Sequence, residues 1–233
     1  SLLLVAAAGA LGLPAAASGA PPWSVPVDLS TPGGHMPSAP SVAVAPEGRA
    51  VVAWWRRDAA LAPKRDVVQM RTRAAFTAPF IGPVTLSRRV INFLPQPHAA
   101  ATGGGLALVG WTEPTRAVVL RVLPRSGPAV PATTLDEGRQ YDLDDLEVGI
   151  APTGAAVAVW TRDPLPHDLT GSLRTVRISV RSASSGAWSA PADLSDPGAD
   201  HPAVAVAPDG SSIVVWERDG AIEASTGDTA GVF

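Results

Sequence analysis

Charged residues recur just after four tryptophans of the sequence. Arginine and aspartate follow Trp54, Trp160 and Trp216, and a glutamate follows Trp111. Two carboxyl groups about 5–10 Å apart can act on a glycosidic bond as acid and as base or nucleophile. The candidates for such chemistry are Asp58, Glu113, Asp163 and Asp219. A charge pair that repeats at strand ends more often fixes a loop or docks neighbouring sheets. We therefore expect structural pairing and keep catalysis as the alternative.

A second group of residues could bind a ligand without reacting with it. These candidates for a ligand-binding face are Arg56, Arg57, Arg162, Arg218, His35, His201 and Trp55. Trp55 and Trp23 fall outside the repeated tryptophan position, so we expect them to be exposed and able to stack on a ligand. The four repeated tryptophans lie in continuous apolar runs, which indicates that they belong to the core.

An acidic run between Asp136 and Glu147 is the one candidate metal site. Clustered carboxylates suit a hard cation, so Asp142, Asp144 and Asp145 are weak candidates for binding calcium. The run lacks the spacing of a known calcium loop, and a solvated loop is the explanation that we favour. The four histidines have no paired spacing and the chain has no cysteine, so we expect no other cofactor.

Composition and the first residues exclude several functions. The 233 residues carry a net charge of −3, which provides no basic surface for nucleic acid. Residues 1–20 are apolar, small and uncharged, as in a partial secretory signal peptide, and are too short and too rich in glycine and alanine to span a membrane. We expect a secreted or cell-surface protein with no membrane span after signal removal.

The repeats that must position these residues predict a β-propeller. Each repeated tryptophan follows a turn glycine by six residues, and the copies lie 49 to 57 residues apart. Each unit contains a strand of small residues, a buried strand, a half-exposed strand and a proline-bearing edge strand, as in a propeller blade. The units span approximately 23–79, 80–127, 128–187 and 188–233, within a repeat region of 21–233.

The sequence allows two arrangements of the blades, a closed four-bladed ring or part of a larger ring. Residues 23–30 match residues 188–195, Trp-Ser-x-Pro-x-Asp-Leu-Ser, and read as an isolated edge strand. If this strand completes the last blade, four blades close into a ring. The alternative, which we favour, is a fragment of a larger ring, in which residues 23–30 pair with strands outside this chain.

The repeats resemble those of secreted bacterial β-propellers in the broad sialidase-like, Asp-box superfamily over residues 22–226. They resemble TolB-type repeats less closely. The Asp-box pattern Ser-x-Asp-x-Gly-x-x-Trp is not matched, since Pro208-Asp209-Gly210 precedes Trp216 at a different spacing. A sialidase-type resemblance implies an arginine cluster and a tyrosine–glutamate nucleophile pair, and the sole tyrosine here is Tyr141.

These observations favour binding over catalysis. In a propeller, the loops after the second strands and the crossovers between blades share one face, and the polar candidates above gather there. We expect a secreted, non-enzymatic scaffold that binds carbohydrate or an extracellular or cell-envelope protein. The alternative is a sialidase-like glycoside hydrolase that uses carboxylates at the channel mouth.

Overall fold

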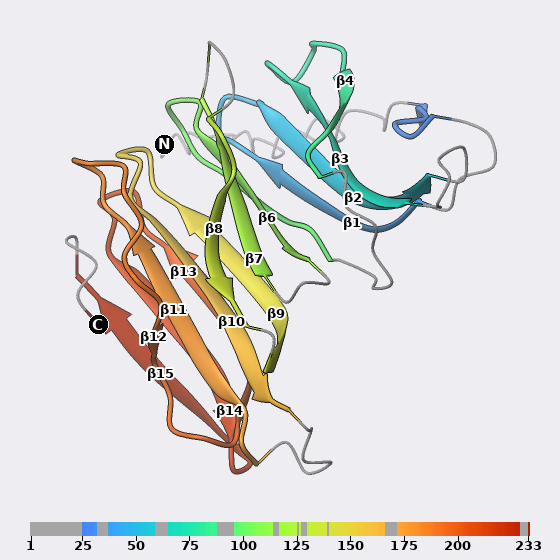
Figure 1. Cartoon of the computed structure of the whole chain (residues 1–233). Coiled ribbons are helices and arrows are strands. Elements are labelled where there is room, and N and C mark those ends of the chain that lie inside the picture. Colours follow the sequence, from blue (N-terminus) through green and yellow to red (C-terminus); the bar gives the residue numbers. More distant parts are fainter. Residues whose placement is uncertain are drawn as a thin grey trace, which may run out of the picture.

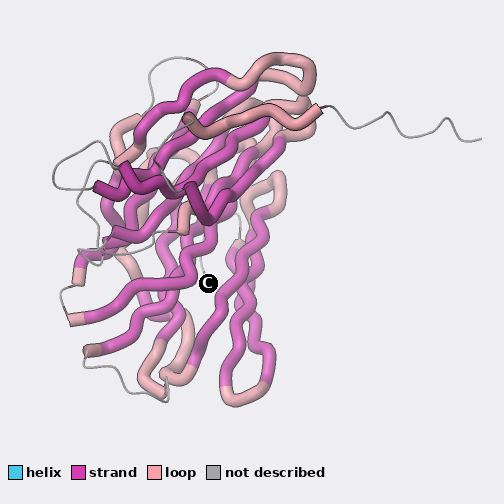
Figure 2. Tube along the Cα trace, turned by 90° about the vertical axis from the view of Figure 1, so that its right-hand side faces the viewer, coloured by secondary structure: helices cyan, strands magenta, loops and turns pink. Residues whose placement is uncertain are grey.

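The computed structural model describes residues 25–31, 37–58, 65–87, 96–113, 117–124, 126, 130–138, 140–165, 172–228 and 233. Throughout this part of the chain the structure consists of strands and loops, with no helix (Figure 2). The expected signal peptide, Trp23 and His35 lie outside the described residues.

Fifteen strands of the described chain form four antiparallel sheets (Figure 1). The first sheet contains β1 (Pro37–Val44), β2 (Ala50–Asp58), β3 (Arg65–Arg73) and β4 (Ile81–Thr85). The second contains β5 (His98–Ala101), β6 (Ala107–Glu113), β7 (Ala117–Leu123) and β8 (Thr133–Glu137). The third contains β9 (Tyr141–Ile150), β10 (Ala156–Pro164), β11 (Thr175–Arg181) and β12 (Ala192–Asp193). The fourth contains β13 (Ala199–Val206), β14 (Ser212–Arg218) and β15 (Ala221–Gly227). The strands of each sheet follow chain order, which is the blade pattern that the repeats predict.

The turn between the first two strands of a sheet depends on glycine. Gly48, Gly154 and Gly210 have φ angles of 83°, 90° and 100°, a left-handed conformation that other residues rarely adopt. The Gly48 amide donates a hydrogen bond to the Ala45 carbonyl at 2.8 Å, closing the turn. The repeated turn glycine therefore sets the register of the hairpin between the first two strands of each sheet.

Each sheet has two faces that we name by their neighbours. The forward face packs on the next sheet of the chain, and the backward face packs on the preceding one. The repeated tryptophans lie on backward faces: Trp111 packs against the first sheet, Trp160 against the second and Trp216 against the third. All four are at most 5% exposed, so the prediction that they form the core is confirmed.

The sheets pack in chain order, and the described strands of the first and fourth sheets do not pack on one another. In Figure 1 the first sheet stands at the upper right and the fourth at the lower left, with the second and third between them. The four sheets therefore form an open arc rather than a closed four-bladed ring.

The predicted edge strand at residues 23–30 is not found in its described part. Residues 25–29 form no strand. Residues 27–30 line a hollow of about 330 Å³ on the first sheet, together with Val52 and Trp54. The segment covers part of the backward face of the first sheet instead of pairing with β15, and the fourth sheet keeps three strands.

Candidate functional site

The first strands of the third and fourth sheets bring three metal- or ligand-binding side chains together. Side-chain oxygen and nitrogen atoms of Asp145, Asp200 and His201 all lie within 4.8 Å of one another. Asp145 belongs to β9 and the other two belong to β13 of the adjacent sheet. This group, which we call the inter-sheet triad, is the candidate functional site.

A recurring β-bulge places these side chains. The register of β13 against β14 shifts between Asp200 and Ala203, and β9 shifts against β10 in the same way. The bulged residues Asp145 and His201 have φ angles of 48° and 50°. Each precedes its turn glycine by nine residues, as does Ala39 of β1, whose φ is 46°. Bulges re-aim side chains, and here they direct an aspartate and a histidine of adjacent sheets toward one another.

Arg174 anchors one side of the triad. Its Nη1 lies 2.6 Å from Asp200 Oδ2, and its Nε donates to Asp163 Oδ2 at 3.2 Å. Asp163 is buried and Asp200 is half-buried, so the arginine joins the third sheet to the fourth. Such charge-assisted hydrogen bonds hold their partners in a fixed geometry.

The two triad carboxyl groups differ in pKa. Removal of water from around Asp145 raises its pKa, and so do the hydrogen bond to Asp200 and the charge of that group. Burial also acts to raise the pKa of Asp200, but hydrogen bonds from Arg174 and from the His201 backbone amide outweigh it and lower that pKa. Asp145 is thus the group that takes a proton first, while Asp200 stays ionised.

Further polar groups border the triad. The His201 side chain is 71% exposed, and its Nδ1 lies 3.8 Å from Glu217 Oε2. Burial and the negative charges of Asp145 and Asp142 raise the pKa of Asp144. Tyr141, whose ring lies 4.3 Å from the guanidinium carbon of Arg162, packs instead on the opposite face of the third sheet, toward the second sheet. The site therefore offers carboxylates as acceptors and cationic donors.

The catalytic candidates do not gather in this way. Glu113 accepts a hydrogen bond from Trp111 Nε1 at 3.3 Å, and Asp163 is held by Arg174. Asp219 follows β14 in a left-handed conformation, 3.6 Å from Arg218 Nη1. Asp58 ends β2, and its side chain lies outside the described residues. The three described carboxylates come from three sheets, and each contacts a partner in its own sheet.

The candidates for the binding face are dispersed, with one exception. Arg57 Nε lies 2.9 Å from Asp66, Arg218 Nη2 lies 2.6 Å from Glu223, and Arg56 is buried. Arg162 stacks on Tyr141, which packs toward the second sheet and away from the triad. His201 alone belongs to the triad.

The expectation that Trp55 is exposed is wrong. The residue is 4% exposed because β2 is covered on both faces. Trp54 points backward under residues 27–30, while Trp55 pairs in register with fully buried Val68 and points forward toward the second sheet. Two adjacent tryptophans can both be core residues in a strand of this kind.

The calcium candidates are divided between two environments. Asp142 and Asp144 pair in register with Asp163 and Thr161 along β10, whereas the bulge turns Asp145 toward Asp200 and His201. Two carboxylates and an imidazole are suitable ligands for a divalent metal. The residues that could hold such an ion are thus those of the triad.

Among the described residues, no helix is long and apolar enough to cross a membrane. Comparison with protein families finds no match, and comparison with curated proteins finds none either.

Solved structures show what the fold is similar to. A protein of unknown function from Dyadobacter fermentans matches with a TM-score of 0.53 and 11% identity, over 83% of this chain and 60% of that one. The α-L-arabinanase of Penicillium chrysogenum, complexed with arabinobiose, matches with a TM-score of 0.49 and 13% identity, over 84% of this chain and 68% of that one. The NanB sialidase of Streptococcus pneumoniae matches with a TM-score of 0.46 and 9% identity, over 74% of this chain and 26% of that one.

These similarities concern the fold. This chain spans about 60% of the length of the Dyadobacter protein. With the sheet topology described above, the match to the Dyadobacter protein confirms the predicted all-β, propeller-type architecture.

Proposed function

We propose that the protein is a secreted propeller-type module that binds carbohydrate at the inter-sheet triad. The observation that carries this proposal is the convergence of Asp145, Asp200 and His201 from two adjacent sheets, with Asp145 and His201 exposed. Carboxylates accept hydrogen bonds from sugar hydroxyl groups, and the nearby arginines and histidine donate them.

The spacing of the triad carboxyl groups favours binding over hydrolysis. Side-chain oxygen atoms of Asp145 and Asp200 lie within 4.8 Å of each other. Glycosidases hold their two carboxyl groups about 5–10 Å apart, which leaves room for the sugar carbon or for a water molecule. A pair held closer than this range binds a hydroxyl group or a cation more readily than it cleaves a bond.

One observation supports the alternative of a glycoside hydrolase. The environments of Asp145 and Asp200 shift their pKa values in opposite directions, which is the pattern of an acid and a base in one active site. If a bound sugar separated the two carboxyl groups, Asp145 would donate the proton and Asp200 would be the ionised partner.

A glycan array with three variants tests the proposal. The wild-type protein should retain a defined set of oligosaccharides, and Asp200→Asn and His201→Ala should weaken their binding at least about tenfold, the effect of losing one charged hydrogen bond. Asp209→Asn is the matched control. Asp209 lies in the β13–β14 turn, away from the triad, and its carboxylate accepts hydrogen bonds from Ser211. Absence of binding to any glycan, or equal binding by all variants, contradicts the proposal.

The same glycans separate binding from hydrolysis. Incubation with the retained oligosaccharides, followed by analysis of their length, should show no cleavage. Cleavage that Asp145→Asn abolishes while glycan retention persists would instead establish the hydrolase alternative.

Export is the second part of the proposal. The apolar, uncharged residues 1–20 support it. Recovery of the protein from the medium, with its first residue near position 18 or 21, is the expected result of expression in a bacterial host that secretes proteins. Retention of the full N-terminus inside the cell would contradict it.

A further inference from the structure

The inter-sheet triad has the ligand chemistry of a transition-metal site. It offers two carboxylate oxygens and one imidazole nitrogen, from the first strands of two sheets, within 4.8 Å of one another. Zinc holds oxygen and nitrogen ligands at about 2.0–2.2 Å, so two of its ligand atoms lie at most about 4.4 Å apart. Asp145 and His201 are exposed, so small movements of their side chains can bring all three ligand atoms to these distances.

Negative charge is in excess around the triad. The positive charge of Arg174 acts on four carboxyl groups. Two of them, Asp163 and Asp200, accept its hydrogen bonds, and the other two are Asp144 and Asp145. One guanidinium group cannot balance four carboxylates, so the group attracts a further cation.

Two of the three ligands are held in the way that proteins hold metal ligands. Arg174 Nη1 lies 2.6 Å from Asp200 Oδ2, and the His201 amide donates to Asp200 Oδ1 at 3.0 Å. His201 Nδ1 lies 3.8 Å from the Glu217 carboxylate. A histidine that binds a metal usually directs its other ring nitrogen at a carboxylate, which fixes the orientation of the ring. Glu217 is placed to accept the proton of one ring nitrogen while the other takes an ion.

The ligand set favours zinc over calcium. Calcium takes about 6–8 oxygen ligands, whereas zinc accepts imidazole and carboxylate together and often keeps an open position beside three protein ligands. The calcium expectation from the sequence concerned acidic residues along one strand. His201 joins Asp145 through the packing of two sheets rather than through a spacing in the sequence, so the sequence did not indicate this ligand set.

We propose that the triad binds a zinc ion through Asp145, Asp200 and His201, and that the open position of the ion takes a hydroxyl oxygen of the bound sugar. The second half of this statement rests on the proposed function, whereas the first half does not. The exposure of Asp145 and His201 makes the ion accessible to a ligand from solvent.

Zinc titration of the whole, untagged chain tests the metal site. Isothermal titration calorimetry after removal of metals with EDTA should show one zinc ion per chain. Asp145→Asn and His201→Ala each remove a ligand, and each should lower the zinc affinity further than Glu217→Gln, which removes an outer partner and should lower it about tenfold. No zinc binding by the wild type, or unchanged binding in the ligand variants, overturns the proposal. Because His201 is exposed, His201→Ala keeps the test valid should Asp145→Asn alter the circular dichroism.

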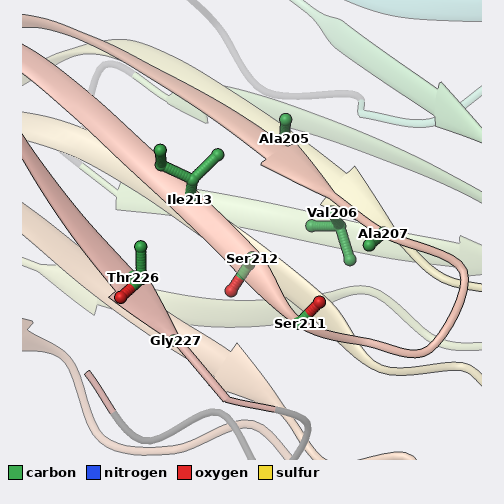
Figure 3. Close-up of a pocket in the computed structure, with 8 residues that line it drawn as sticks. All are labelled: Ala205, Val206, Ala207, Ser211, Ser212, Ile213, Thr226 and Gly227. Atoms are coloured by element: carbon green, nitrogen blue, oxygen red, sulfur yellow. The ribbon is translucent and has the colours of Figure 1, made fainter.

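Asp209→Asn is the control for a general effect of charge. Asp209 lies in the β13–β14 turn, at the other end of β13 from the triad, and its Oδ1 accepts from Ser211 Oγ at 2.7 Å. Ser211 borders a hollow of about 400 Å³ on the fourth sheet, and none of the residues that line this hollow has a carboxylate or an imidazole (Figure 3). The variant should therefore bind zinc as the wild type does. A loss of affinity as large as that of His201→Ala would overturn the assignment to the triad.

The glycan array separates this inference from the proposed function. EDTA should reduce the retention of the oligosaccharides, and added zinc should restore it in the wild type but not in His201→Ala. Retention that EDTA leaves unchanged would overturn the contact between zinc and sugar, while the proposed function would stand. Zinc binding in the calorimeter with no glycan retained would overturn that contact and the proposed function together, while the metal site would stand.

Discussion

Two polar clusters join neighbouring sheets, and they differ in how completely their charges are paired. Between the second and third sheets, Asp136 Oδ2 lies 2.7 Å from Arg177 Nη1 and accepts from Trp160 Nε1 at 3.3 Å. Arg177 Nε also lies 2.9 Å from Asp193. Between the third and fourth sheets, Asp145, Asp200 and His201 are more exposed, and their ligand atoms, two carboxylate oxygens among them, lie within 4.8 Å of one another.

The difference separates a structural cluster from a binding cluster. In the Asp136 cluster every charge faces an opposite charge or the indole of a core tryptophan, and the same use of a carboxylate recurs where Trp216 Nε1 donates to Glu223 at 2.9 Å. The triad instead holds two carboxyl groups within 4.8 Å of each other beside an anchoring arginine. Like charges in contact are unfavourable unless a proton, a cation or a ligand lies between them.

The largest expected effect concerns the core tryptophan beneath the structural cluster. Trp160→Ala should lower the free energy of unfolding by about 3–5 kcal/mol, because it removes a fully buried side chain between two sheets. Urea denaturation followed by circular dichroism measures the change. A midpoint equal to that of the wild type would refute the core assignment.

The next effect tests the structural cluster itself. Asp136→Asn should lower the free energy of unfolding by about 1.5–3 kcal/mol, because Arg177 and the Trp160 indole lose a charged acceptor at a site that is 14% exposed. Glycan binding should not change. A variant as stable as the wild type would mean that the two clusters do not differ in the way described.

A smaller effect on stability is expected in the triad. Asp200→Asn should change the free energy of unfolding by at most about 1 kcal/mol, because the pair is partly exposed and Arg174 keeps Asp163 as a partner. Thermal unfolding monitored by intrinsic tryptophan fluorescence is the measurement. A loss as large as that of Asp136→Asn would assign the triad to the framework of the fold.

The smallest effect is a dependence of stability on pH. The pKa of Asp145 is raised above its ordinary value of 3.8, so the folded state binds this proton more tightly than the unfolded state does. The contribution of this group to stability is therefore present below 3.8 and is lost as the pH rises through the folded-state pKa. Asp145→Asn should remove this loss, as shown by urea midpoints of both proteins across that range. Parallel pH profiles for the two proteins would contradict the assignment.

The repeated parts of the fold could be predicted from the sequence, because each copy has the same local causes. A turn glycine six residues before a tryptophan specifies a hairpin, and the continuous apolar run around Val157 and Trp160 specifies a strand buried on both faces. The sequence also favoured an open arc over a closed ring, but it did not place residues 23–30. They have the sequence of an edge strand, but the partner of an edge strand is set by packing over long distances, and residues 27–30 line a hollow on the first sheet instead.

The candidate site could be predicted only in part. The sequence identified Asp145 as a calcium candidate and His201 as a binding residue, but it did not bring them together. They meet because each lies at the bulge nine residues before its turn glycine. That shared position is a signal in the sequence, although its meaning depends on a bulge that no composition or periodicity indicates. For Trp55 the sequence signal was misleading. The residue falls outside the repeated tryptophan position, which suggested exposure, but its strand is covered on both faces and the side chain is buried.

The most direct test of the account is to measure Asp136→Asn and Asp200→Asn side by side for both unfolding free energy and glycan binding. The account predicts opposite results: Asp136→Asn loses stability and keeps its binding to the glycans of the array, whereas Asp200→Asn keeps its stability and loses that binding. Equal losses of both properties in the two variants would contradict it, because the two inter-sheet clusters would then have the same role.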